Sequence, residues 1–302
     1  VLCPKTAKNV WLEESKKWLI NKRKTQVLSA QSEFDADAGL VIGNYDNLHI
    51  QPFLQKKVFD VIIADEIHTC KNDSARRSKF FFNLKARKKI GLSGTPLLNK
   101  PQDLLNAMRW LDPFWNDFQV RGDRFLNMNG ITLSLDEVQD VLRSTMMLRR
   151  VQAQVFENEP AEKRVIPIEP GALKTLVEQE LVGLEDYTQL RKQLALGKVR
   201  YAINHINTYS SEGEKIVVFA YHREVIERIA SSLGKAAVTI HGDTTEAERR
   251  DNADRFRNDP ECTVIIGSIP AMGMAINLSV ASHIVFVEMD WTPGMMEQAE
   301  ER

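Results

Sequence analysis

The run Phe59-Asp60-Val61-Ile62-Ile63-Ala64-Asp65-Glu66-Ile67-His68 decides the fold class of this 302-residue chain. Its apolar, β-branched part is typical of a buried strand, and two adjacent carboxylates follow it directly. Ligands of α/β proteins bind outside the carboxyl ends of such strands, so Asp65 and Glu66 indicate a binding site there. An isolated Asp-Glu pair would more often be a solvated strand end or a helix N-cap. The surrounding sequence has to decide between a binding site and these structural explanations.

Seven further apolar, β-rich runs lie on either side of this one and alternate with helical stretches. The alternation predicts an α/β fold in which mainly parallel sheets are flanked by helices. The predicted strands are 26–29, 40–43, 58–64 and 89–92 in the first half, and 215–220, 237–241, 262–268 and 283–288 in the second. Two groups of strands predict two sheets.

The length of the chain favours two domains, and we expect two lobes, 1–155 and 156–302. The sequence between the groups of strands has the amphipathic pattern of helices, with a helical insertion at about 100–150 and a helical segment at about 171–210. Apart from 164–168, this region offers few strand candidates.

Cysteine usage and hydropathy exclude several classes of protein. Cys3, Cys70 and Cys262 lack the spacing of a disulfide framework or a zinc site, which suits a reducing compartment. No apolar run is long enough to span a bilayer, and the first residues lack the layout of a signal peptide. We expect no membrane association. The expected location is the cytoplasm, with the nucleoid, or the cytoplasm of a host if the protein is viral, or the nucleus if it is eukaryotic. Since the chain begins without Met and stops inside an expected helix, we also expect a fragment.

Charge is unevenly distributed although the net charge is −1. Residues 1–150 hold 24 Lys and Arg against 17 Asp and Glu, and residues 151–302 hold 16 against 24, so the halves carry +7 and −8. Eight basic residues lie within 71–89, against the single acid Asp73. This density would attract a phosphate backbone, but a solvated helix face gives the same pattern.

A second motif, Ser93-Gly94-Thr95-Pro96-Leu97-Leu98-Asn99, follows the next predicted strand, and Ser93 lies 28 residues after Asp65. Gly94 permits a tight turn and Pro96 fixes the exit of the chain. The hydroxyls of Ser93 and Thr95 can then project toward a neighbouring site. The alternative is an ordinary turn rich in Ser, Gly and Pro.

Asp65-Glu66-Ile67-His68 resembles the DEAH-type box of superfamily 2 helicases. Residues 93–99 resemble the SGTPxxN motif of these helicases, in the form found in the Snf2 branch. The resemblance covers essentially the whole chain. Within the family, the sequences of residues 219–222 and 288–301 are most similar to the annealing-helicase branch related to the HepA proteins. The other segments that resemble the family, in its order, are 1–4 with Trp11 and Trp18, then 42–48, 147–150, 217–222, 240–244, 268–278, 291–293 and 298–302.

The resemblance implies two RecA-like lobes with ATP between them and duplex DNA lying across both. ATP binding would close the cleft and hydrolysis would reopen it, so that the protein moves along DNA. The implied enzyme is a DNA-dependent ATPase that uses ATP and Mg²⁺ to translocate on duplex or branched DNA, irrespective of sequence, in remodelling or annealing. Protein partners are not implied.

The resemblance also assigns roles to residues. Asp65 would hold Mg²⁺, usually through water, Glu66 would polarise the attacking water, and His68 would link the nucleotide site to the interface between the lobes. Arg302 aligns with an arginine that reaches the γ-phosphate. The alternatives are a core histidine at 68 and a surface salt bridge at 302. Residues expected to couple the nucleotide to the lobes are Ser93, Gly94, Thr95, Gly273 and Gln298.

Contacts to DNA are expected from backbone amides, hydroxyls and basic side chains, because a motor must tolerate any sequence. The DNA-binding candidates are Lys5, Tyr45, His222, His241, Gly242 and Ser268, together with Ser93. As individuals, each has an alternative explanation as a loop or packing residue. Arg149 and Arg150 are expected to brace the lobes instead of contacting DNA.

The sequence departs from the family pattern in three places. The glycine-rich Walker loop would precede Val1, the end of the last motif would follow Arg302, and Ala275 stands where many relatives have glycine. We therefore expect the fragment itself to be inactive. Two other functions stay open: a catalytically inactive scaffold with two lobes that binds DNA or protein, and the motor subunit of a phage or restriction system.

Overall fold

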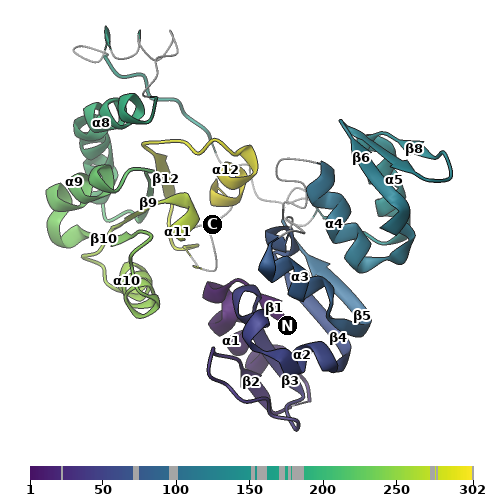
Figure 1. Ribbon diagram of the computed structural model, residues 1–302. Helices are drawn as coiled ribbons and strands as arrows, with labels where there is room; N and C mark the ends of the chain where they lie inside the picture. The colour runs from purple at the N-terminus through teal and green to yellow at the C-terminus, as the bar shows by residue number, and fades with distance from the viewer. Residues whose placement is uncertain are drawn as a thin grey trace. The chain divides into compact units, whose positions relative to one another are not determined.

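Figure 1 shows the computed structural model, which describes residues 1–21, 23–70, 75–94, 101–150, 154, 162–169, 174–175, 178, 187–272, 276 and 278–300. The chain divides into two compact units, Val1–Arg164 and Val165–Arg302. Each unit contains a parallel sheet flanked by helices, which confirms the α/β class predicted from the sequence.

The first unit is built on a five-stranded sheet of order β2-β3-β1-β4-β5, in which all neighbouring strands run parallel. The strands are β1 (Leu2–Cys3), β2 (Thr25–Val27), β3 (Leu40–Asn44), β4 (Val58–Asp65) and β5 (Lys85–Leu92). The helices and 3₁₀ turns around it are η1 (Lys5–Ala7), α1 (Lys8–Trp18), η2 (Tyr45–Ile50), α2 (Pro52–Lys56), η3 (Ile67–Cys70) and α3 (Arg76–Phe82).

Two strands differ from the sequence prediction. β1 lies between β3 and β4, at the centre of the sheet, but its two residues are too few to show a period of alternation. β5 begins at Lys85, four residues before the predicted start at Lys89. It is the outer strand of the described sheet, where charged side chains reach solvent and interrupt the apolar pattern.

The core of the first unit fixes the turn that follows β4. Ile62 and Ala64 of β4 pack with Ile67, the first residue of η3, and with Phe81 of α3. Gly91 of β5 lies so close that a Cβ atom there would be 3.0 Å from Cδ1 of Ile67. The absent side chain therefore lets the turn after β4 pack against β5.

The helical prediction for 100–150 is incomplete. The helices of this region are α4 (Pro101–Leu111), the turn η4 (Pro113–Asp117) and α5 (Leu135–Thr145). A three-stranded antiparallel sheet lies between η4 and α5 in the sequence, and its strands are β6 (Phe118–Arg121), β7 (Arg124–Asn127) and β8 (Thr132–Leu133). Gly122, with φ of 63°, begins the two-residue turn between β6 and β7. A Gly-X turn between short apolar runs is a hairpin signal, and here it outweighs the amphipathic helical pattern.

The strand predicted at 164–168 is wrong. The structure has no strand in 162–169, where Val165 is 95% exposed and Ile166 is half exposed. Pro167 has no backbone N–H to give to a ladder, and this extended segment pairs with no strand among the described residues.

The second unit contains a four-stranded parallel sheet of order β10-β11-β9-β12. Its strands are β9 (Ile216–Phe219), β10 (Ala237–Ile240), β11 (Val264–Gly267) and β12 (His283–Phe286). Its helices are α8 (Tyr187–Ser210), α9 (Arg223–Leu233), the short turn η6 (Gly234–Ala236), α10 (Glu246–Asn258), α11 (Ile269–Met272) and α12 (Pro293–Glu300).

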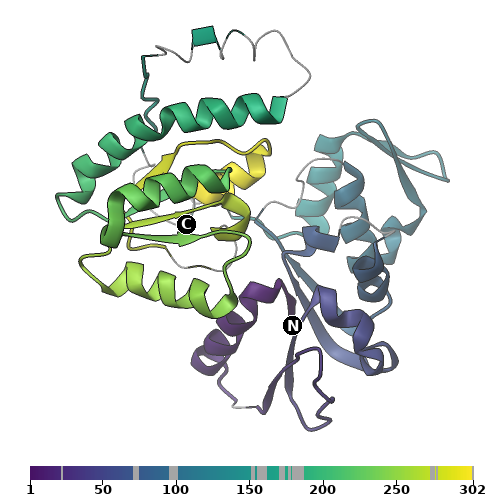
Figure 2. The same cartoon turned by 60° about the vertical axis from the view of Figure 1, so that its left-hand side comes forward.

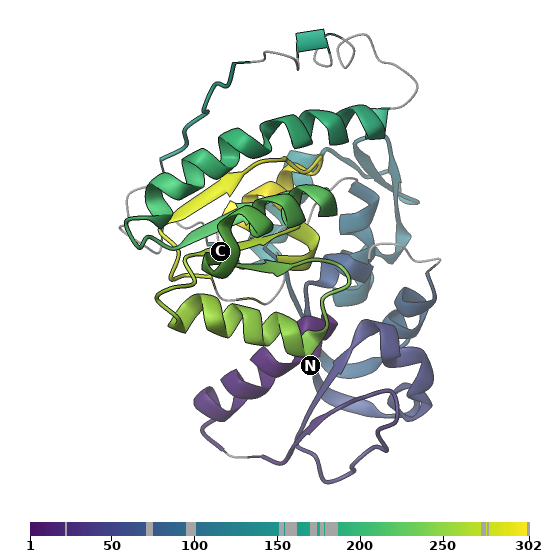
Figure 3. The ribbon, with the colours of Figure 1, turned by 90° about the vertical axis from the view of Figure 1, so that its left-hand side faces the viewer.

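Helices cover both faces of this sheet. α8 and α9 lie side by side over the face that carries Ile216 and Val218, and α10 lies on the opposite face with Val217 and Phe219 (Figures 2 and 3). β9 is therefore apolar at every position, as buried parallel strands are. Among the helices that the structure describes, none combines the length and apolarity that crossing a bilayer requires.

Candidate functional site

Asp65 is the last residue of β4, and two aromatic side chains hold it in place. The indole Nε1 of Trp11, in α1, donates a hydrogen bond to Asp65 Oδ2 at 2.8 Å. The hydroxyl of Tyr45, in η2, donates to the backbone carbonyl of Asp65 at 2.6 Å. These helices follow β1 and β3, so the carboxyl edge of the sheet gathers residues that are far apart in the sequence.

Burial keeps the groups around Asp65 in their neutral forms. The pKa of the Tyr45 hydroxyl is raised above its usual range by burial first and by nearby acidic groups second, so it stays a hydrogen-bond donor. The Cys3 thiol of β1 has a pKa raised to about 12, by burial and then by the charge of Asp65. The Tyr45 hydroxyl and the Cys3 thiol beside Asp65 are therefore both neutral.

Glu66 has an unusual backbone. Its φ of 50° lies in the left-handed region, where no other non-glycine residue of the described chain is found. This conformation costs roughly 1–3 kcal/mol and persists where the surrounding structure enforces it, often at functional sites. The next residue, Ile67, is packed in the core, so the chain turns sharply between strand and core and leaves the Glu66 side chain at the sheet edge.

His68 connects the first motif to the second. Its Nδ1 lies 3.3 Å from Glu66 Oε2 and 2.8 Å from Ser93 Oγ, just beyond β5. The His68 and Glu66 side chains are only 11% and 18% exposed. The structure therefore brings Glu66, His68 and Ser93 together, with the Ser93 hydroxyl bonded to the His68 ring.

The donor set at this edge fits a magnesium ion with nucleotide. Oδ1 of Asp65 accepts no hydrogen bond from a described residue, and Mg²⁺ prefers one or two carboxylate oxygens, completing its six ligands with water and phosphate. Within the described ranges, no three His, Cys, Asp or Glu side chains converge as a metal cage would require. The Asp65 carboxylate suits a metal that also binds phosphate, since Mg²⁺ is commonly held by one or two carboxylates together with phosphate oxygens.

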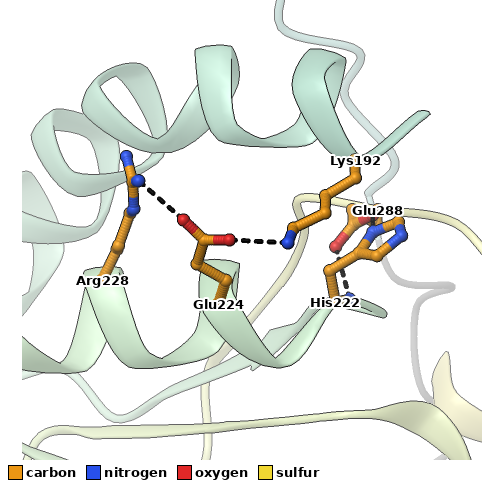
Figure 4. A network of polar contacts seen from close by, with 5 residues as sticks. All are labelled: Lys192, His222, Glu224, Arg228 and Glu288. Carbon is orange, nitrogen blue, oxygen red and sulfur yellow. Dashed lines mark hydrogen bonds and ion pairs between the residues drawn. The ribbon is translucent and has the colours of Figure 1, made fainter. Parts of the chain in front are cut away.

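In the second unit, the carboxyl edge of the sheet carries an acid that the sequence analysis did not single out. Glu288, two residues after β12, has a side chain that is only 4% exposed. Its Oε2 accepts the backbone N–H groups of Tyr221 and His222, both at 2.9 Å, and its Oε1 lies 2.6 Å from His222 Nδ1 (Figure 4). One carboxylate thereby fixes the loop that begins α9.

An exposed set of ion pairs lies beside it. Glu224 of α9 contacts Lys192 of α8 at 2.7 Å and Arg228 at 2.6 Å (Figure 4). Hydrogen bonds from Lys192 and then Arg228 lower the pKa of Glu224. These pairs join α8 to α9, but partly exposed ion pairs contribute little to stability.

Replacing Glu288 with Ala should loosen the start of α9, because two buried N–H groups and His222 lose their acceptor. We expect the Tyr221 and His222 amides of the full-length protein to exchange with deuterium about 30-fold faster, corresponding to about 2 kcal/mol. Glu224→Ala is the matched control on the same helix, and its expected change is below about threefold. Equal exchange in the Glu288→Ala and wild-type proteins would show that the carboxylate does not hold the loop.

Three further DNA-binding candidates, His241, Gly242 and Ser268, lie at the carboxyl edge of the second sheet, whereas Lys5 is exposed in η1 of the first unit. His241 and the exposed Gly242 follow β10, and Ser268 follows β11. His241 donates its backbone N–H to Thr244 Oγ1 at 3.0 Å, and its Nδ1 is buried with no hydrogen-bond partner among the described residues. The parallel strands thus bring these residues to one edge of the second unit.

Tyr45 is the DNA-binding candidate that the structure does not support as a direct contact. Its side chain is 3% exposed, it packs against Phe81, and its hydroxyl is bonded to Asp65. A nucleic acid cannot reach it without opening the core. Tyr45 is better described as a support for Asp65.

Several candidates fall on residues that the structure leaves undescribed. Thr95, Gly273 and Arg302 lie outside the described residues, as does the side chain of Gln298, although its backbone belongs to α12. Gly94 is exposed, and a Cβ atom there would meet nothing within 4 Å. The roles given to these residues stay predictions.

Trp291 belongs to an exposed aromatic and basic surface that the sequence analysis did not include among the site residues. The Arg191 guanidinium of α8 lies 4.3 Å from the centre of the Trp291 ring, and Arg191 donates to the carbonyl of Met289 at 3.2 Å. Trp291 is 66% exposed, and such a contact contributes about 0.5–1 kcal/mol at exposed sites. Aromatic residues this exposed are the signal that would have identified the surface.

The basic cluster within 71–89 is divided between two elements. Arg77 of α3 pairs with Asp46 at 3.5 Å, and Arg87 of β5 pairs with Asp60 at 3.2 Å. The cluster is therefore not one solvated helix face, since its described members are Arg76, Arg77 and Lys79 on α3 and Lys85, Arg87, Lys88 and Lys89 on β5.

Comparison with known proteins gives matches over both units. Residues 1–171 match the family model of the SNF2-related domain, and residues 197–302 match that of the helicase conserved C-terminal domain. The chain is 28% identical to "SWI/SNF-related matrix-associated actin-dependent regulator of chromatin subfamily A-like protein 1" of Xenopus tropicalis, covering 100% of this chain and 36% of that protein. It is also 28% identical to the "DNA annealing helicase and endonuclease ZRANB3" of Homo sapiens, covering 100% of this chain and 32% of that protein.

Among solved structures, the SWI2/SNF2 ATPase core of Sulfolobus solfataricus in complex with dsDNA matches at 21% identity and a TM-score of 0.44, covering 99% of this chain and 73% of that one. The chain spans about a third of the length of the curated relatives named above. The match to an annealing helicase agrees with the branch that the sequence motifs indicate.

Proposed function

This chain belongs to the SNF2-related family of helicase-like ATPases, and we propose that the protein containing it hydrolyses ATP to translocate on duplex or branched DNA. One observation carries the proposal: at the carboxyl edge of the first sheet, Asp65 is fixed by two aromatic donors while His68 joins Glu66 to Ser93. Such an arrangement suits phosphoryl transfer, which depends mainly on positioning and neutralisation of charge. ATP and Mg²⁺ are the proposed cofactors.

Each residue of the proposed ATPase site has a task. Bound Mg²⁺ and ATP supply the reacting phosphate and neutralise its charge. Asp65 would hold the metal, usually by way of water, while Glu66 would orient the attacking water and accept its proton. His68 transmits the position of Glu66 to Ser93. The residues proposed to take up this signal or to reach the phosphates are Gly94, Thr95, Gly273, Gln298 and Arg302.

DNA is the proposed partner, without dependence on sequence. We assign phosphate contacts to Lys5 in the first unit and to His222, His241, Gly242 and Ser268 at the carboxyl edge of the second sheet. Backbone amides, hydroxyls and basic groups position DNA without reading bases. The similarity to a DNA annealing helicase favours branched or partly unpaired substrates.

The test is to measure phosphate release by the full-length protein with and without duplex or fork DNA. We expect DNA to raise the rate by roughly 5- to 150-fold, the usual range for coupling between two sites. Displacement of a third strand from a DNA triplex should accompany this stimulation. DNA binding without turnover would instead support the inactive scaffold, and a nuclease or methylase domain in the same protein would support the restriction system.

A further inference from the structure

Trp11 is bonded to the proposed metal carboxylate, although no sequence motif assigns it a role there. Its indole N–H donates to Asp65 Oδ2 at 2.8 Å across 54 residues of sequence. A donor bonded to an ionised oxygen forms a stronger hydrogen bond than a neutral pair and fixes the plane of the carboxylate. With Oδ2 occupied in this way, Oδ1 is the oxygen left for a metal or its water.

Trp11 is half-buried and is not part of the buried hydrophobic core. It belongs to none of the four hydrophobic clusters of the described residues, and α1 has no fully buried residue. The polar contacts of α1 with the sheet are the Trp11 bond and one from Lys8 Nζ to the carbonyl of Leu28 at 3.1 Å. The Trp11 bond is thus one of two side-chain hydrogen bonds that join α1 to the first sheet and its strand ends.

α1 is also continuous with a proposed DNA contact. The turn η1, which carries the exposed Lys5, runs directly into α1, and both follow β1, the strand beside β4. A force on Lys5 would reach Trp11 within two helical turns and Asp65 through one hydrogen bond. The other side-chain hydrogen bond to Asp65 among the described residues, from Tyr45 to its carbonyl, holds the backbone and not the carboxylate.

We propose that Trp11 is a positioning residue that orients Asp65 for Mg²⁺ and couples the DNA-facing start of α1 to the metal site. The inference rests on the proposed function. DNA bound near Lys5 holds α1 and the Trp11 bond in place, which raises the affinity for metal and nucleotide. Because coupling between sites is reciprocal, metal and nucleotide also raise the affinity for DNA.

The test uses the full-length protein with Trp11→Phe, which removes the N–H and keeps an aromatic ring. The affinity for Mn²⁺, a paramagnetic substitute for Mg²⁺, is measured by electron paramagnetic resonance with ADP present, with and without duplex DNA. We expect Mn²⁺ affinity to fall about 10-fold, as when a partner of a metal ligand is lost. We also expect DNA to lose most of its effect on that affinity, and kcat at saturating Mg²⁺ to change by less than about threefold.

Trp18→Phe is the matched control, because Trp18 lies on the same helix, is exposed, and donates to Glu14. It should leave Mn²⁺ affinity unchanged. Tyr45→Phe removes the other support of Asp65 and should weaken Mn²⁺ binding by about threefold, a smaller loss because it acts through the backbone. If Trp11→Phe does not fold, the Trp11 indole N–H of the wild-type protein carries the test: its exchange with deuterium should slow when duplex DNA binds, and unchanged exchange would overturn the inference.

Two negative results are distinguishable. If wild-type protein binds Mn²⁺ with ADP, Asp65→Asn abolishes that binding, and Trp11→Phe leaves it unchanged, then Trp11 does not position Asp65 and the inference is wrong. If wild-type protein binds no Mn²⁺ with ADP at all, the proposed ATPase function fails, and the inference fails with it.

Discussion

Replacing Glu66 with Gln in the full-length protein is expected to abolish DNA-stimulated phosphate release, lowering kcat by about 10²- to 10⁴-fold. Gln has nearly the same shape as Glu but cannot accept a proton from the attacking water. The left-handed backbone at this position and the contact with His68 can both be kept by Gln, so the fold is spared. Nucleotide and metal binding should therefore persist while turnover is lost.

Asp60→Asn is the control for this variant. Asp60 lies on the same strand, β4, but its side chain is 83% exposed and pairs with Arg87. Turnover should stay within about twofold of wild type, since an exposed ion pair contributes little. Phosphate release by Glu66→Gln at the wild-type rate would remove Glu66 from the chemistry.

Replacing Asp65 with Asn is expected to have a different effect of similar size. Asn can still accept the Trp11 hydrogen bond through its amide oxygen, so the sheet edge is preserved. The loss of the negative charge removes the proposed metal ligand, and we expect turnover to fall by about 10³-fold, corresponding to several kcal/mol of lost charge stabilisation.

A metal-binding measurement distinguishes the role proposed for Asp65 from the role proposed for Glu66. In Asp65→Asn, binding of Mn²⁺ with ADP should disappear, whereas Glu66→Gln should retain it. The measurement is electron paramagnetic resonance on both variants beside the wild type. If Asp65→Asn binds Mn²⁺ as wild type does, the metal is held elsewhere, and the division of labour between the two carboxylates is wrong.

The alternatives to the motor differ in what these variants would show. An inactive scaffold has no turnover to lose, and its DNA binding should be indifferent to Asp65 and Glu66. The strained backbone of Glu66, which costs roughly 1–3 kcal/mol, favours a functional site at this edge of the sheet, since such conformations cluster at active sites, ligand clamps and switch regions. The contact from His68 to both Glu66 and Ser93 adds to this argument, since it joins two motifs around one site.

The sequence by itself determined the elements whose signal is local. The apolar run of β4, the acids after it and the fully apolar strand β9 follow from residue order alone. β9 is the clearest case, because a strand buried on both faces must be apolar at every position. The order and spacing of the motifs also indicated the family. The hairpin at Gly122 was equally local, and a two-residue turn with glycine would have revealed it.

Tertiary structure alone decided which distant residues meet. The bonds from Trp11 to Asp65 and from His222 to Glu288 join residues 54 and 66 positions apart. Each depends on which strands are neighbours, and the placing of the two-residue strand β1 beside β4 leaves no pattern in the sequence. Hydrophobic periodicity reports which face of an element is buried, whereas partners at a sheet edge are set by strand order, which is a property of the whole fold.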